Sequence, residues 1–150
     1  MDQYNTQNNT EQVLTDTDKL MAMFAHLSIF FGSLWIPLIF WAIYREKSKF
    51  VSFHSLQALF FHLAYVVVLV VLVLFVALVG MIAGLINTKG GPPAAPDVLQ
   101  IIVILALAVV VLGFIFGSIA YAVYLAINSY KGGMKKYPIV GNMVYRRLYA

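Results

Sequence analysis

The sequence contains no cysteine and few charged side chains, and both absences exclude classes of protein. Without cysteine there can be no disulfide framework, thiolate metal site or cysteine nucleophile. Charged residues make up only 11% of the 150 residues, whereas hydrophobic residues make up 62%. Because a soluble domain carries about 25% charged residues, this chain cannot cover a water-facing surface. A soluble enzyme, a secreted domain and a nucleic-acid-binding protein are therefore excluded, and a membrane protein is indicated.

Acidic side chains are missing from the apolar stretches of the chain. No Asp or Glu lies between Glu46 and Asp97, and none follows Asp97. The common phosphate-binding, zinc-protease and serine-hydrolase motifs are also missing. Catalysis by proton transfer and ion-coupled transport would therefore lack their usual carboxylates within a bilayer. We expect a protein that is not an enzyme, with no catalytic residues, no metal site and no cofactor.

Three apolar stretches are long enough to cross a bilayer, which takes about 20 helical residues. We expect an all-α fold, an integral membrane bundle of three transmembrane helices over residues 20–44, 56–86 and 98–128. Residues 1–17 are expected to be a disordered polar tail, and residues 18–150 a single membrane domain. Thr15 or Thr17 can cap the first helix, and Pro37 predicts a kink near Ser33.

The segments on either side of these spans have their own expected structures. The second helix begins near Phe50, before its span, and its first turns are expected to lie at the membrane interface. After the third span, Pro138 stands at a plausible first helical position. The alternatives for this segment are an amphipathic C-terminal helix on the headgroup layer and a frayed tail. The apolar face of such a helix would contain Ile139, Val140, Met143, Val144 and Leu148.

Basic residues are distributed unevenly and predict an orientation. Three lie in the turn at residues 45–49 and five at residues 131–147, against only Lys19 in the tail and Lys89 in the Pro- and Gly-rich loop. Because basic loops stay in the cytoplasm, three spans would place the N-terminus outside the inner (plasma) membrane and the C-terminus inside the cell. The expected partner is a bilayer with anionic headgroups, contacted through Lys131, Lys135, Lys136, Arg146 and Arg147.

Polar side chains gather on one arc of the second helix, spanning about 160° at 100° per residue. They are His54, Ser55, Gln57, His62 and Tyr65. Because polar groups are costly inside a bilayer, they should face other helices or a wet crevice. The alternatives are a proton-responsive pocket and plain hydrogen bonding between helices, and the second is the commoner case.

A further histidine, His26, lies on the predicted first span and is expected to bond a carbonyl group freed by Pro37. A metal site formed by His26, His54 and His62 is disfavoured, because carboxylates are missing and the two histidines of the second helix are not spaced as an i,i+4 pair.

Two pairs of glycines predict close helix packing. Gly80 and Gly84 lie on the second helix, and Gly113 and Gly117 on the third. Small residues four apart allow helix backbones to approach each other in lipid. The two pairs lie at different depths, so at least one is expected to pack against the first span or against another copy. A second copy or another membrane protein is therefore an expected partner.

Several motifs resemble the MamF-like family of small bacterial membrane proteins, a domain of unknown function related to the chloroplast inner-envelope Tic protein-import component. The resemblance covers about residues 18–145. It rests on Ala25-His26-Leu27-Ser28, on Phe50-Val51-x-x-His54 followed by Gln57-Ala58-Leu59, and on Tyr137-Pro138. The family usually has Lys and Asn where this chain has Leu56 and Phe60.

The resemblance implies an integral membrane protein of three or four helices, and it implies little about activity. Some relatives influence mineral crystal growth on magnetosomes. Here Asp97 is the only acidic residue of the predicted outer loop, so mineral binding has no support from the residues. Two functions remain. One is a packing or assembly partner within a membrane complex, and the other is a small transport or pore-forming protein, either import-channel-like or holin-like.

Overall fold

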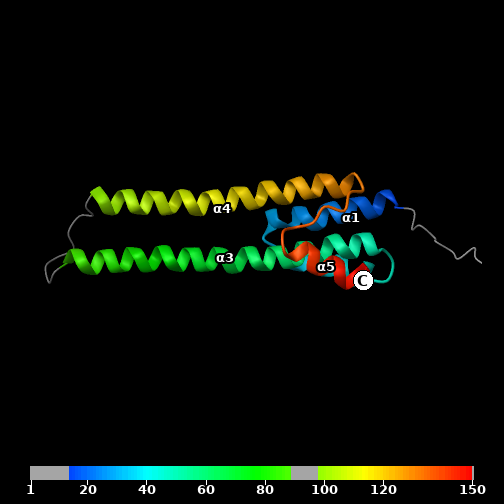
Figure 1. The fold of residues 1–150 in the computed structure, drawn as a ribbon, viewed down its shortest axis with the longest axis horizontal. Coiled ribbons are helices and arrows are strands. Elements are labelled where there is room, and N and C mark those ends of the chain that lie inside the picture. Colours follow the sequence, from blue (N-terminus) through cyan, green and yellow to red (C-terminus); the bar gives the residue numbers. More distant parts are fainter. Residues whose placement is uncertain (1–13, 89–97, 150) are drawn as a thin grey trace, which may run out of the picture.

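The computed structural model describes residues 14–88 and 98–149, which form helices and no strand. The elements are α1 (Asp16–Leu27), the 3-10 turn η1 (Ser28–Phe31), α2 (Trp35–Tyr44), α3 (Lys49–Thr88), α4 (Val98–Tyr130) and α5 (Val140–Tyr149). The two long helices, α3 and α4, run side by side in opposite directions, and the short helices gather at one end of this pair (Figure 1). The predicted all-α class is confirmed.

Two parts of the molecule need names. The base consists of residues 14–62 and 119–149, which include every short helix, the start of α3 and the end of α4. The arm consists of residues 63–88 of α3 and 98–118 of α4. Nearly all the buried side chains lie in the base, whereas the apolar side chains of the arm are exposed along its length.

The predicted first span is not a single helix. Helix α1 ends at Leu27, η1 follows, and α2 begins only at Trp35. Leu14, just before α1, and Arg45, just after α2, line the same pocket, so the chain runs out along α1 and returns along α2. With 12 and 10 residues, the two helices are about 18 and 15 Å long, each too short for a hydrocarbon core of about 30 Å.

The reversal between α1 and α2 has a local cause in the sequence. Gly32 adopts a left-handed φ of 57°, which residues with a side chain rarely do, and it ends η1. Pro37 then lies in the first turn of α2, where its missing N–H has no helical partner to lose. The Ser33 hydroxyl accepts a hydrogen bond from the Ile36 N–H at 3.4 Å. The proline therefore helps to start a second helix rather than kinking a first.

Helix α1 begins inside the segment that was expected to be a disordered tail. Thr15 is its N-cap: the hydroxyl of Thr15 accepts from the Asp18 N–H, and the Asp18 carboxylate accepts from the Thr15 N–H, both at 3.1 Å. This reciprocal capping box confirms Thr15 as a cap. The rest of the predicted tail, residues 1–13, lies outside the described residues.

Two helices of the described chain are long and apolar enough to cross a membrane. They cover Lys49–Leu85 and Val98–Tyr130, whose most apolar stretches of 18 residues have mean hydropathies of 3.4 and 3.2. Their arm portions are exposed, as at Leu74 (63%) and Val109 (68%). The predicted second and third spans, 56–86 and 98–128, thus fall in α3 and α4, and three spans reduce to two candidates.

The first turns of α3 are enclosed by protein, and their place relative to the membrane interface stays a prediction. Residues 50–58 are all buried, on the apolar as well as the polar side of the helix. On the apolar side, Phe53, Leu56 and Val144 form a core cluster against which Trp41 packs from α2. The α1–α2 hairpin, α5 and the end of α4 surround these turns, and so the polar groups there face protein.

Helix α5 confirms the predicted C-terminal helix but not its start or its partner. It begins at Val140, two residues after Pro138, because Ile139 turns the chain with a φ of 64°. Val144 is buried against α3, whereas Ile139 (87% exposed) and Met143 (54% exposed) point away. The helix therefore packs on the protein with only part of the predicted apolar face.

Candidate functional site

The most distinctive site is a buried polar core in the base, where α1, α3 and the segment that follows α4 meet. Helix α1 and η1 contribute His26 and Ser28, α3 contributes His54, Gln57 and His62, and the C-terminal segment contributes Tyr137. All six side chains are buried. Residues more than 100 positions apart in the sequence are thus brought into one cluster.

Three rings form a hydrogen-bonded chain through this core. The Tyr137 hydroxyl lies 3.3 Å from Nδ1 of His26, and Nε2 of His26 lies 3.1 Å from Nδ1 of His54. In a neutral imidazole one nitrogen donates a hydrogen bond and the other accepts one. The direction of one hydrogen bond to His26 therefore fixes the direction of the other. The chain has two neutral arrangements, one with the Tyr137 O–H donating to His26 and one with the direction reversed.

Gln57 joins the C-terminal segment to α3 through its amide group. Its Nε2 donates to the Lys135 carbonyl at 3.1 Å, and its Oε1 accepts from the Tyr137 N–H at 3.2 Å. One side chain therefore satisfies two backbone groups that are 78 and 80 residues away in sequence. The Tyr137 ring also stacks on Phe61, with ring centroids 3.9 Å apart.

Of the predicted polar arc, His54, Gln57 and His62 enter the core. His62 lies there with its Nδ1 3.5 Å from the Ser28 hydroxyl, which itself donates to the Ala25 carbonyl at 2.8 Å. Ser55 is buried close by. Tyr65 does not take part, since it stacks on Phe114 of α4 with centroids 5.5 Å apart.

Two residues of the core had other predicted roles or none. His26 was expected to bond a carbonyl freed by Pro37, but its ring partners are His54 and Tyr137. Tyr137 was not predicted as a core residue at all. The signal in the sequence was the Tyr137-Pro138 motif. A large aromatic residue in a short segment between lysines and a helix indicates a buried side chain.

Burial keeps His26 and Tyr137 uncharged. Desolvation, followed by the neighbouring His54 and His62, holds the pKa of His26 well below 6.5. Desolvation, followed by Tyr121, raises the pKa of the Tyr137 hydroxyl above its usual value of 10.0. Both groups are therefore neutral at pH 7, and the core binds its segments through neutral hydrogen bonds.

Several polar atoms of this region have no hydrogen-bond partner among the described residues. They are the hydroxyl oxygens of Ser52 and Ser55 and the Nε2 atoms of His54 and His62. The Gly133 peptide lies beside His54 without reaching hydrogen-bonding geometry with that atom. Within residues 14–88 and 98–149 there is also no group of three or more His, Asp or Glu side chains arranged to hold a metal ion.

The four candidate packing glycines all lie in the arm. A methyl group added at Gly80, Gly84, Gly113 or Gly117 would meet nothing within 4 Å. The structure therefore does not use these glycines to pack the chain against itself. Gly141 of α5, by contrast, is closely packed against the same chain. An added methyl carbon there would lie 2.5 Å from the Lys136 Cβ and 2.8 Å from the Gln57 Oε1.

The five C-terminal cations predicted to contact headgroups lie in the base, before or within α5. Lys131, Lys135, Arg146 and Arg147 are exposed. Lys136 is half-buried, with its ammonium group 3.5 Å from the centroid of the Tyr145 ring. Their proximity to lipid stays a prediction.

The polar core collects the motifs that carried the family resemblance. His26 and Ser28, then His54 and Gln57, then Tyr137 come from three separate motifs and meet in one cluster. No curated protein and no solved structure matches the chain, and the expected relation to the Tic component stays a prediction. A family model described as the magnetosome magnetite crystal formation protein family matches residues 17–144, which include all of these motifs. The chain therefore belongs to that family, as a membrane protein of the MamF-like type.

Proposed function

We propose that the protein is a non-enzymatic assembly partner in a membrane complex, which binds another transmembrane helix through its arm. The observation that carries the proposal is the open space around the four arm glycines. Apolar burial offers no driving force between helices in lipid, so a helix pair needs close backbone contact to associate. Small residues four apart supply that contact, and the chain leaves both pairs unused.

The positions of the two pairs favour a partner outside the chain. By a rise of 1.5 Å per residue, Gly80 lies about 12 Å from the end of α3 at Thr88, and Gly113 lies about 22 Å from the start of α4 at Val98. Because these two helix ends lie together, the pairs sit at different depths. A second copy of this chain or another membrane protein can reach both.

The arrangement of the base supports an orientation that differs from the one expected from three spans. If only α3 and α4 cross the membrane, residue 14, the turn at 45–49 and the segment at 131–149 lie on one side. All ten basic residues except Lys89 then lie on that side. The rule that basic segments stay in the cytoplasm favours an inner-membrane protein with both ends cytoplasmic, which replaces the outside N-terminus.

Cross-linking in intact membranes tests the assembly proposal. Leucine at Gly117 would fill the space that a partner backbone needs, so Gly117→Leu should lower the cross-linked fraction about fivefold, for a loss of about 1 kcal/mol. Gly84→Leu tests the second pair in the same way. Ala108→Leu is the matched control, because Ala108 is exposed on the opposite face of α4. Unchanged cross-linking in both glycine variants would refute the proposal.

Transport or pore formation is less well supported. Residues 66–86 of α3 and 101–117 of α4 contain no charged, hydroxyl or amide side chain. The arm of one chain therefore offers no polar path along which water or ions could pass. The polar core lies at one end of the molecule and does not extend into the arm.

A further inference from the structure

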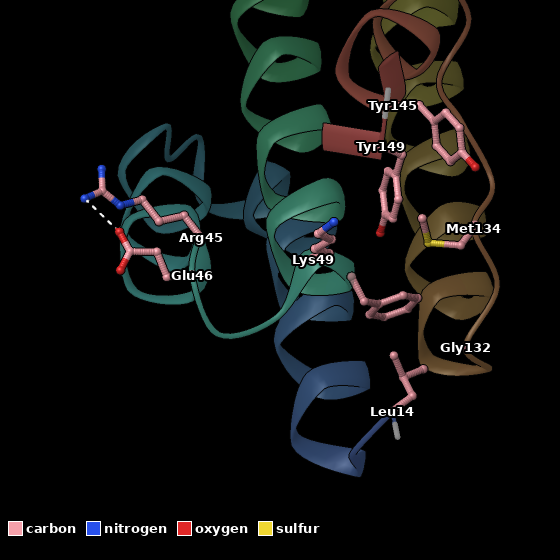
Figure 2. Close-up of a pocket in the computed structure, with 9 residues that line it drawn as sticks. Leu14, Arg45, Glu46, Lys49, Gly132, Met134, Tyr145 and Tyr149 are labelled. Carbon is pink, nitrogen blue, oxygen red and sulfur yellow. Dashed lines mark ion pairs between the residues drawn. The ribbon is translucent and has the colours of Figure 1, made fainter. Parts of the chain in front are cut away.

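A second site lies at the free end of the base, apart from the polar core. It is a pocket of about 770 Å³ between the starts of α1 and α3, the end of α4 and α5. Figure 2 shows Lys49 and Tyr149 beside each other, with Met134 and Leu14 on the same side of α3. Its wall combines two cationic groups with one acidic, two phenolic and several apolar groups, namely Arg45 and Lys49, Glu46, Tyr145 and Tyr149, and Leu14, Phe50 and Met134.

We propose that this pocket binds the phosphate group of an anionic phospholipid, with the Lys49 ammonium group and the Tyr149 hydroxyl as its main contacts. The lipid would pack its glycerol and first methylene groups against Leu14, Phe50 and Met134. Neither the arm glycines nor the assembly proposal enters this inference, so the two can fail separately.

Lys49 is available to a ligand. Its ammonium group lies 5.8 Å from the centroid of the Tyr149 ring, and within the described ranges no carboxylate pairs with it. An ammonium group at the rim of an apolar pocket attracts a phosphate more strongly than one in open water, because the pocket excludes part of the screening solvent.

Arg45 can add a second positive charge. In this structure its guanidinium group pairs with Glu46 at 3.4 Å, and both side chains are largely exposed. Figure 2 shows this pair turned away from Lys49. An exposed pair of this kind contributes little stability, so a phosphate in the pocket can compete with Glu46 for Arg45.

Tyr149 can donate a hydrogen bond to the phosphate. Partial burial, and then Tyr145 beside it, raises the pKa of its hydroxyl, which therefore keeps its proton at neutral pH. The stacked rings of Tyr145 and Tyr149, with centroids 4.8 Å apart, hold the phenol in place.

A lipid fits the pocket better than free phosphate for two reasons. The apolar wall has nothing to offer a small hydrated anion, whereas it can cover the carbon chain next to a lipid phosphate. The base that holds the pocket also carries nine of the ten basic residues, so it would face an anionic leaflet if the arm crosses the membrane.

Thermal unfolding of the purified full-length protein in a neutral detergent tests this proposal, since a bound lipid raises the unfolding temperature in a saturable way. Three additives are titrated: short-chain phosphatidylglycerol, phosphatidylcholine of the same chain length, and inorganic phosphate. We expect saturable stabilisation by phosphatidylglycerol alone. Equal stabilisation by phosphatidylcholine would overturn the role of the charge, and saturation by inorganic phosphate at the same concentrations would overturn the lipid assignment.

Matched variants locate the site. Lys49→Gln should raise the apparent dissociation constant for phosphatidylglycerol about tenfold or more, because it removes a charged hydrogen bond. Tyr149→Phe keeps the ring and should raise it about threefold. Lys131→Gln removes the same charge from the same end of the base but lies outside the pocket, so it should change the constant less than about twofold. Equal effects of Lys49→Gln and Lys131→Gln would show a diffuse surface charge and refute the pocket.

Discussion

Helix α3 belongs to both parts of the molecule, and the base and arm surround it differently. Residues 50–58 are buried on every side by other segments of the same chain. From Leu63 onward the same helix is largely exposed, and its only ring contact to α4 is the stack of Tyr65 on Phe114. One continuous helix is thus fully packed by the same chain at one end and presents an exposed apolar surface at the other.

This difference between the base and the arm separates the contacts that fold the chain from the surface that is exposed for association. In the base, hydrogen bonds and close packing fix each segment, as Gln57 does for the chain at Lys135 and Tyr137. In the arm, no close contact holds α3 to α4 at the glycines. Changes that remove contacts in the base should therefore lower the stability of the single chain, whereas a side chain added at an arm glycine should break no contact within it.

The largest expected effect comes from Tyr137, whose ring is buried in the base. Tyr137→Ala removes the stack on Phe61 and the partner of His26, and it should lower the free energy of unfolding by about 3–5 kcal/mol. Tyr130→Ala is the control, because this tyrosine is 52% exposed and its loss should cost less than about 0.5 kcal/mol. Thermal unfolding in detergent measures both. Similar losses would mean that the base has no specific core.

An alanine placed at one glycine of each part gives a sharper test. Gly141→Ala pushes a methyl group against Lys136 and the Gln57 amide, so it should destabilise the base by about 1–3 kcal/mol. Gly80→Ala meets nothing in the arm and should stabilise the chain by up to about 1 kcal/mol through helix propensity. Opposite shifts of the unfolding temperature are expected, and shifts of the same sign would contradict the distinction between the parts.

A further test of the base concerns pH. Because burial keeps the pKa of His26 below 6.5, the unfolded chain binds a proton there more readily than the folded one. Above about pH 6.5, His26 is neutral in both states and does not lower the stability. As the pH falls below 6.5, only the unfolded chain gains this proton, so the free energy of unfolding falls by at most about 1.4 kcal/mol per pH unit. Unfolding temperatures between pH 8 and 5 should fall more steeply in the parent protein than in His26→Gln. Parallel pH profiles would show that His26 is protonated equally in both states.

Much of the base could not be predicted from the sequence, for a physical reason. The polar arc at His54, Gln57 and His62 was visible from its periodicity, and so was a helix after Pro138. Periodicity, however, says which side of a helix is polar and not what faces it. The sequence could not show which segments face this arc, and the structure puts α1 and Tyr137 there.

The first span failed for a different reason. Residues 20–44 are apolar enough for a membrane helix, and composition alone cannot distinguish one long helix from two short ones. The reversal depends on the left-handed backbone of Gly32 and on the hydrogen bond from the Ile36 N–H to the Ser33 hydroxyl, which are local features. A proline five residues after a glycine is a signal for two helices as much as for a kink.

The hydrogen bond between His26 and Tyr137 spans 111 positions, which has a consequence for biosynthesis. When α1 and the first turns of α3 leave the ribosome, the residue that completes their polar interior has not yet been made. Both long helices must be synthesised before Tyr137 appears. The base can therefore complete its packing only after both long helices have been synthesised. Membrane insertion of the arm would come first, and the C-terminal segment would pack against the base last.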